Sequence, residues 1–216
     1  IEGQTTGRVD LTFAGTNFRN ASGTLGANIT ANAGSTDSGL IPVNGELKLS
    51  ATNGLFSIDV ANLRTDKSTL TASGRFDLKD QDSNLALALR SANASEIDRL
   101  VRVLNLSDEL ENQLDSMQAA LAGNLTFDGT LTGNFADPTI DGKASLDSLS
   151  LRGREVGSVA TDISVSPFEV NLTNGRLQDR SGGSALFSVN IPRTGTNNVA
   201  VKATLTNINA GNLLAA

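Results

Sequence analysis

The sequence predicts an all-β chain with a short helical insertion, an elongated and curved antiparallel sheet that forms an open groove with a hydrophobic concave face. Three observations lead to this fold class. Apolar residues recur at every second position in many short segments, which is the periodicity of a strand with one dry and one solvated face. Gly, Asn, Asp and Ser separate these segments, as the turns of a meander require. Only one stretch, at about 93–121, has apolar residues at helical spacing.

The first expected β block covers residues 1–92. A short unit of Gly, any residue, an apolar residue, any residue and a second apolar residue recurs in it, for example from Gly45 to Leu49. Gly at the start of a strand fits the exit of a turn or a bend that curves the sheet. The alternating apolar residues of this block include Val9, Leu11, Phe13, Leu47, Leu49, Phe56, Ile58, Val60, Phe76, Leu85, Leu87 and Leu89.

Residues 93–121 are expected to form two short amphipathic helices that cross between the β blocks. Ser95 and Asp98 are placed as a capping box for the first helix, and a second apolar stripe ends at Leu121. Packing of the first helix against the sheet is the favoured interpretation, and binding to a membrane surface is the alternative.

The second expected β block covers residues 122–216 and repeats the alternation of the first. About a dozen strands are expected in the whole chain. The alternating apolar residues of the second block include Leu125, Phe127, Ala144, Leu146, Leu149, Leu151, Ile163, Val165, Val170, Leu172, Phe187, Val189, Ile191, Val199, Val201, Ala203 and Leu205.

Composition excludes several classes of function. A net charge of -6 and a pI near 4.6 disfavour contact with phosphate backbones, so we expect no nucleic-acid partner. The chain has no Cys and no His, which removes thiol chemistry together with the commonest general base and metal ligand. We therefore expect no enzymatic activity, no catalytic residue, no metal and no cofactor.

One segment has a spacing that calcium loops share. Asp80, Asp82 and Asn84 stand at alternate positions, as in the opening of an EF-hand loop, but Leu85 replaces the required Gly and Ser91 the bidentate Glu. A polar hairpin loop is the favoured interpretation, with calcium binding as the alternative. The chain begins at Ile1 in a strand-like pattern without Met or a signal-like segment, so we expect it to be part of a longer protein.

One stretch supports a family resemblance. The run from Asp128 to Ala144, DGTLTGNFADPTIDGKA, resembles a phrase typical of the TamB/AsmA-like family, in which G-x-L-x-G is followed by D-P-x-x-x-G. The run from Ile41 to Gly45 is a weaker second copy without the Asp. Amphipathic strands rich in Ser, Thr and Asn, with a helical interruption, agree with the resemblance over nearly the whole chain.

The resemblance implies a taco-shaped sheet in the periplasm of a diderm bacterium, as part of a protein anchored in the inner membrane. It implies a hydrophobic trough that shields phospholipid acyl chains on their way to the outer membrane. It also implies a barrel partner of the TamA or BamA type, bound through parts outside this chain. The family's anchor and its barrel-docking portion have no counterpart here.

The aliphatic character of the inward positions suits acyl chains, because non-directional contacts let a chain slide without being held at one position. Two alternatives remain open, a scaffold that assists outer-membrane β-barrel assembly by strand augmentation and a structural module with a closed sandwich. The residues expected to line the groove are Phe13, Leu49, Phe56, Ile58, Phe76, Leu87, Phe127, Leu146, Leu151, Ile163, Phe187 and Val201.

Overall fold

Twelve strands make up nearly all of the described structure. The computed structural model describes residues 4–15, 17–31, 41–77, 82–97, 120–134, 137–193 and 198–208. The strands form one sheet in chain order, from β1 to β12, and the pairs whose register is described are antiparallel. β1 and β12 stand at the two ends of this order, so the described sheet is unclosed. The predicted fold class, an open antiparallel β-sheet, is confirmed.

Most of the alternating apolar residues of both predicted blocks lie in strands. The first six strands are β1 (Gln4–Thr12), β2 (Ser22–Thr30), β3 (Asn44–Thr52), β4 (Leu55–Arg64), β5 (Ser68–Asp77) and β6 (Ser83–Ser91), with the short helix η1 (Phe18–Asn20) after β1. The next six are β7 (Ala120–Asn134), β8 (Asp137–Leu151), β9 (Arg154–Val165), β10 (Glu169–Gln178), β11 (Ser184–Pro192) and β12 (Ala200–Thr206).

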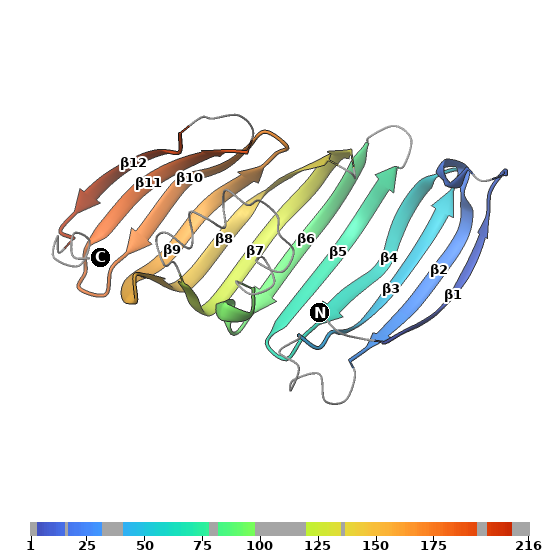
Figure 1. Cartoon of the computed structure of the whole chain (residues 1–216), viewed down its shortest axis with the longest axis horizontal. Coiled ribbons are helices and arrows are strands. Elements are labelled where there is room, and N and C mark those ends of the chain that lie inside the picture. The colour runs from blue at the N-terminus through green and yellow to red at the C-terminus, as the bar shows by residue number, and fades with distance from the viewer. Residues whose placement is uncertain are drawn as a thin grey trace. The chain divides into compact units, whose positions relative to one another are not determined.

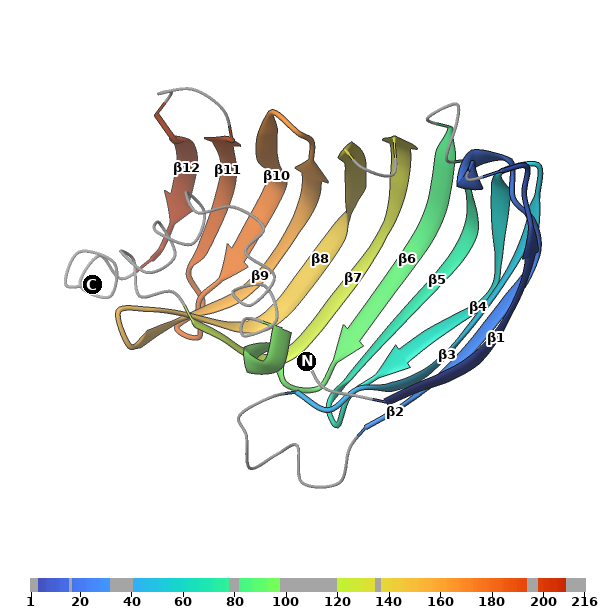
Figure 2. The ribbon, with the colours of Figure 1, turned by 45° about the vertical axis from the view of Figure 1, so that its right-hand side comes forward.

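The chain divides into two compact units. The first comprises Ile1–Leu89 and Gly129–Thr139, and the second comprises Arg90–Asp128 and Ile140–Ala216. In the first unit, β1 to β5 lie side by side in chain order (Figure 1). These strands bend along their length (Figure 2).

In the first unit the pairing register sorts the side chains onto two faces, because directly opposite residues of paired strands point to the same side. Leu25 lies opposite both Val9 and Leu49, and Leu49 in turn lies opposite Ile58. Polar partners occupy the other face, where Lys48 lies opposite Gly26 and Val60. The first unit therefore has one apolar face, whose members include Val9, Leu11, Leu25, Ala27, Ile29, Leu47, Leu49, Ala51, Phe56, Ile58, Leu63, Leu70 and Phe76.

Bulges keep that face continuous where the alternation of the sequence changes. In β4 the register shifts after Ile58, so that the next residues on the apolar face are Ala61, three positions later, and Leu63. A bulge adds one residue to a strand and thereby exchanges its faces. The simple alternation that grouped Val60 with Ile58 is wrong at this point, because Val60 lies opposite Lys48 on the polar face.

The most buried part of the first unit lies at one end of these strands. Ala21 is 1% exposed and packs with Ala51 and Phe56. The Phe56 ring stacks on that of Phe76, with centroids 4.9 Å apart and planes 6° from parallel. A two-residue turn of Asn53 (φ 50°) and Gly54 (φ 88°) joins β3 to β4 here, as a tight hairpin requires. The Gly54 amide donates to the Ala21 carbonyl at 2.8 Å, which attaches the turn to this cluster.

The second unit has the same two-faced construction. Leu172 lies opposite Ile163 and Val189, and Val189 lies opposite Val201. Bulges in β8 and β10 again change the apolar spacing from two to three. On the polar face, Leu186 is an exception, since it lies opposite Arg176 and is 60% exposed.

The described helical backbone between the blocks covers residues 94–97. Its cap is Asn93, whose side-chain oxygen accepts from the Ser95 amide at 3.2 Å and from the Ser95 hydroxyl at 2.8 Å. The prediction of Ser95 as the capping residue is wrong, because Ser95 already lies inside the first turn. Leu121 belongs to β7 and not to a helix. Asp98 and the rest of the predicted helices up to 119 lie outside the described residues, as do Asp80 and Gln81 of the predicted polar loop.

Candidate functional site: an apolar sheet face

The apolar face is only partly covered in each unit. In the first unit Phe56 is 7% exposed, whereas Val9 is 65% exposed. In the second unit Leu146 is 9% exposed, whereas Val201 is 63% exposed. All twelve strands belong to one sheet, so in the described part of the chain no second sheet seals this face. The closed sandwich considered as an alternative is therefore wrong for these residues.

Most of the residues predicted to line the groove lie on the apolar face of their unit. Cross-strand partners place Leu49, Phe56, Ile58 and Phe76 there in the first unit, and Leu87 alternates with Leu85 and Leu89 along β6. In the second unit the register places Leu146, Ile163, Phe187 and Val201 on the corresponding face.

Phe127 lies in β7, on the side of the strand opposite to that of Asp128, and its ring lies against Gly142, the partner of Ile163 on the apolar face. Two predicted lining residues have different surroundings. Leu151 is the last residue of β8 and faces Arg154 across the tight turn to β9. Phe13 lies beyond the end of β1 and is 37% exposed. It marks the rim of the sheet rather than a strand position.

A hollow of about 360 Å³ lies on the apolar face of the first unit. Gly45 on β3 lies between two of the lining residues, Ile29 on β2 and Leu63 on β4. A Cβ atom at Gly45 would come within 2.8 Å of the Leu63 Cδ2 atom, so the Leu63 side chain lies over this glycine. The residues around the hollow are Thr5, Ile29, Val43, Leu63, Arg64, Thr65, Ser68, Leu70 and Leu89.

None of the residues predicted to line the groove borders this hollow. Ile29 and Leu70 follow the same alternation as the predicted lining residues, Leu63 resumes it after the bulge in β4, and Gly45 opens one of the recurring Gly units. A strand glycine flanked by apolar residues marks a place where a neighbouring group can approach the backbone closely. The volume falls within the range of pockets that take small apolar ligands.

In the second unit, aromatic rings cover glycines on the same face. A Cβ atom at Gly142 would come within 2.6 Å of the Phe127 ring, and one at Gly175 within 2.5 Å of the Phe187 ring. Each ring therefore lies directly over a neighbouring strand's backbone.

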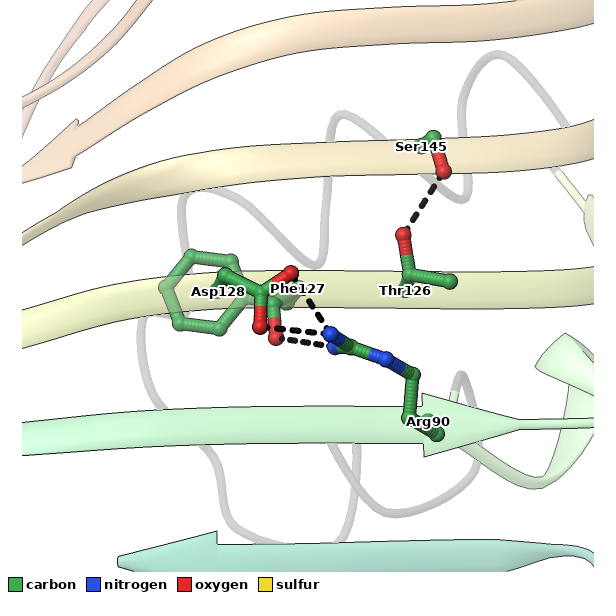
Figure 3. A network of polar contacts seen from close by, with 5 residues as sticks. All are labelled: Arg90, Thr126, Phe127, Asp128 and Ser145. Carbon is green, nitrogen blue, oxygen red and sulfur yellow. Dashed lines mark hydrogen bonds and ion pairs between the residues drawn. The ribbon is translucent and has the colours of Figure 1, made fainter. Parts of the chain in front are cut away.

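Polar contacts hold the strands together on the other face. The Arg90 guanidinium on β6 donates to both oxygens of Asp128 on β7, at 2.6 and 2.8 Å, and to the Phe127 carbonyl at 3.0 Å. The hydroxyls of Thr126 and Ser145 bond at 2.7 Å between β7 and β8. Figure 3 shows that these side chains bridge neighbouring strands. Because these contacts are exposed to solvent, each adds little to the free energy of unfolding. Their main effect is to hold neighbouring strands in register.

Two exposed carboxylates, one in β10 and one in the turn after it, favour their charged form. Hydrogen bonds from the Asn171 and Asn190 side chains lower the pKa of Glu169, and bonds from the Ser181 amide and hydroxyl lower the pKa of Asp179. Both groups are therefore acceptors and not proton donors at neutral pH. Within the described ranges, no group of three or more acidic side chains is placed to hold a metal ion. The described helices include none with the length and hydropathy to cross a membrane.

Comparisons with protein family models, with curated proteins and with solved structures found no match to this chain.

Proposed function

We propose that this chain shields the acyl chains of phospholipids against the apolar face of its sheet. The observation that carries the proposal is the incomplete burial of aliphatic and aromatic side chains that the pairing register aligns in each unit. Soluble proteins seldom leave aligned apolar residues partly exposed over many strands unless a partner covers them.

The chemistry of the face favours acyl chains over ligands that need directed polar contacts. Five of the nine residues around the hollow are aliphatic, namely Ile29, Val43, Leu63, Leu70 and Leu89. The hydrogen-bonding groups described above lie mainly on the opposite face. A methylene chain gains free energy from area contact alone, at about 25 cal/mol per Å² buried, and needs no fixed donor or acceptor.

The wider role follows from the family resemblance of residues 128–144. We propose a periplasmic segment of a TamB/AsmA-like protein, anchored in the inner membrane and acting in phospholipid transport to the outer membrane. A barrel of the TamA or BamA type would then bind through parts outside this chain. The two partly covered faces support the lipid-shielding part of this proposal.

The test introduces a charge on the apolar face and measures bound lipid. We expect Leu49→Arg and Phe127→Asp to reduce the phospholipid that co-purifies with the chain at least several-fold. An acyl chain that covered the new charge would remove it from water without a partner, which costs free energy. Native mass spectrometry after gentle extraction measures the bound lipid.

Matched controls place the same charges on the polar face. Thr24 is exposed and lies on β2, the strand beside that of Leu49, and its control variant is Thr24→Arg. Thr130 is exposed and lies on β7, the strand of Phe127, and its control variant is Thr130→Asp. Both controls should retain the lipid content of the unaltered chain, and circular dichroism should show the same strand content in all four variants. Equal lipid content in the apolar-face variants and the controls would refute the proposal.

A further inference from the structure

A hollow of about 420 Å³ lies on the polar face of the second unit. Leu186 on β11 borders it and is 60% exposed, although its partners across the strands are Arg176 on β10 and Thr204 on β12. Two residues further along β11, Ser188 lies opposite Lys202 on β12. Arg176 and Lys202 both border the hollow. An exposed leucine therefore lies between two cations, one on each neighbouring strand.

Neither cation is held by a partner within this surface. Among the described residues, the Arg176 guanidinium and the Lys202 ammonium group have no ion pair and no side-chain hydrogen bond, whereas Arg180 binds a carboxylate. Asn174, which also borders the hollow, donates to Asp162 at 2.7 Å, so the carboxylate of Asp162 has a neutral partner. These side chains project from the face of the sheet, and the pairing of strands side by side does not cover them.

The distance between the two cations favours two separate anionic groups over one. Neighbouring strands lie about 4.8 Å apart and successive residues of one face about 6.8 Å apart, so the Cα atoms of Arg176 and Lys202 are about 12 Å from each other. A single phosphate placed between them would lie over the Leu186 side chain, where it would lose water without gaining a hydrogen bond. Two carboxylates on either side of an apolar group match the arrangement.

We propose that Arg176, Leu186 and Lys202 form a docking surface for an extended acidic segment of a partner protein. In this segment an apolar residue has Asp or Glu two positions before it and two positions after it. Such residues lie on one side of an extended chain, and the two acids are about 13 Å apart, close to the distance between the cations. The carboxylates bind Arg176 and Lys202, and the apolar side chain packs on Leu186 in the hollow.

The docking surface is independent of the proposed lipid shielding, because it lies on the opposite face of the sheet. Leu186 and Ser188 alternate along β11 with Phe187, which belongs to the apolar face. A failure of one proposal therefore leaves the other standing.

The first experiment titrates the isotope-labelled 216-residue chain with a short peptide and follows the backbone amides by NMR. The peptide has seven residues and blocked ends, with Asp at the second and sixth positions, Leu at the fourth and Thr elsewhere. We expect saturable shifts at the residues that border the hollow. A peptide with Asn in place of both Asp should give no saturable shift. A peptide of the same composition with its two Asp side by side should bind at least about threefold more weakly, because adjacent residues of an extended chain point to opposite sides.

The second experiment repeats the titration on variants of the docking surface. Arg176→Glu and Lys202→Glu should each raise the Kd about fivefold or more, since each places like charges together. Leu186→Ser should raise it about threefold through lost apolar contact. The matched control is Arg75→Glu, which makes the same change in net charge at an exposed position opposite Ser57 in the first unit and should leave the Kd within about twofold. Circular dichroism should show the same strand content in all variants.

Selective loss of affinity in the three surface variants, together with a preference for the spaced acids, supports the proposal. A titration without saturable shifts overturns it, as does an equal loss of affinity in Arg75→Glu or equal binding of the peptide with adjacent Asp. Inorganic phosphate that gives the same shifts at lower concentration than the peptide would identify a simple anion site instead. Vesicles of phosphatidylglycerol that bind through Arg176 and Lys202 more tightly than the peptide would identify a membrane contact instead, and either result overturns the proposal.

Discussion

Glycines in the sheet have different roles according to what lies above them. The Leu63 side chain lies over Gly45, and the Phe127 ring lies over Gly142. Gly26, on the polar face opposite Arg8 and Lys48, has no heavy atom within 4 Å of the position that a Cβ would take. The same residue type is therefore required at some positions and replaceable at others.

Gly142→Ala should destabilise the chain by about 1–3 kcal/mol, because the added methyl group would overlap the Phe127 ring and the Asp128 carbonyl. Gly26→Ala is the matched control and should be neutral or stabilise by about 0.5 kcal/mol, since it lowers the entropy of the unfolded chain without overlap. Urea unfolding followed by circular dichroism measures both. Equal effects of the two substitutions would show that the ring does not need the glycine beneath it.

At the scale of the strand, bulges and side-chain clusters keep neighbouring strands in register. The bulge in β10 lies between Leu172 and Gly175, where Asn174 adopts a φ of 51° and donates to Asp162 on β9 at 2.7 Å. Near one end of the same strand, Glu169 accepts from Asn171 at 2.8 Å and from Asn190 on β11 at 2.7 Å. Polar contacts on one face thus align the apolar residues on the other.

The Glu169 cluster predicts a dependence of stability on pH. Its pKa is lowered in the folded chain by the Asn171 and Asn190 bonds, so the unfolded chain binds the proton more readily. The stabilisation by the carboxylate is fully present above the unfolded pKa and is lost as the pH falls through the folded pKa. The difference in urea midpoint between the unaltered chain and Glu169→Gln should therefore shrink on acidification from neutral pH. A difference that is constant over this range would contradict the role of the charge.

At the scale of the whole chain, both units repeat one design, in which a polar face carries the cross-strand bonds and an apolar face stays partly uncovered. The first unit adds a hollow bordered by aliphatic residues, and the second adds rings laid over glycines. The design suits a surface that accepts many equivalent apolar contacts.

Binding of a lipid to the folded chain alone predicts a stabilising effect. A single-chain lysophospholipid, kept below its micelle concentration, should raise the free energy of unfolding, by about 2.7 kcal/mol when its free concentration is a hundred times its Kd. Leu49→Arg should show little of this rise and Thr24→Arg nearly all of it. Thermal unfolding followed by circular dichroism measures the effect. A rise of the same size in Leu49→Arg would indicate binding elsewhere than on the apolar face.

The period of two was sufficient to predict the strands and the sharing of a face by residues such as Leu49 and Ile58. The period of two did not predict the bulges. In the sequence, a spacing of three between apolar residues, as from Ile58 to Ala61, cannot be distinguished from an interruption of the alternation. The helix start was placed two residues late, since Asn93 with Glu96 has the same capping spacing as Ser95 with Asp98. The hollow depends on which strands lie side by side, and the sequence pattern does not contain the pairing of the strands.

The order of the strands has a kinetic consequence. Each strand pairs with its predecessor in the chain, and most of the connections between them are short, so each closing step loses little loop entropy. Such a chain can acquire structure progressively, from whichever end is synthesised or delivered first. At every stage of folding, the strand that was added last provides the backbone groups with which the next strand pairs. Extension of the sheet therefore needs no segment from a distant part of the sequence.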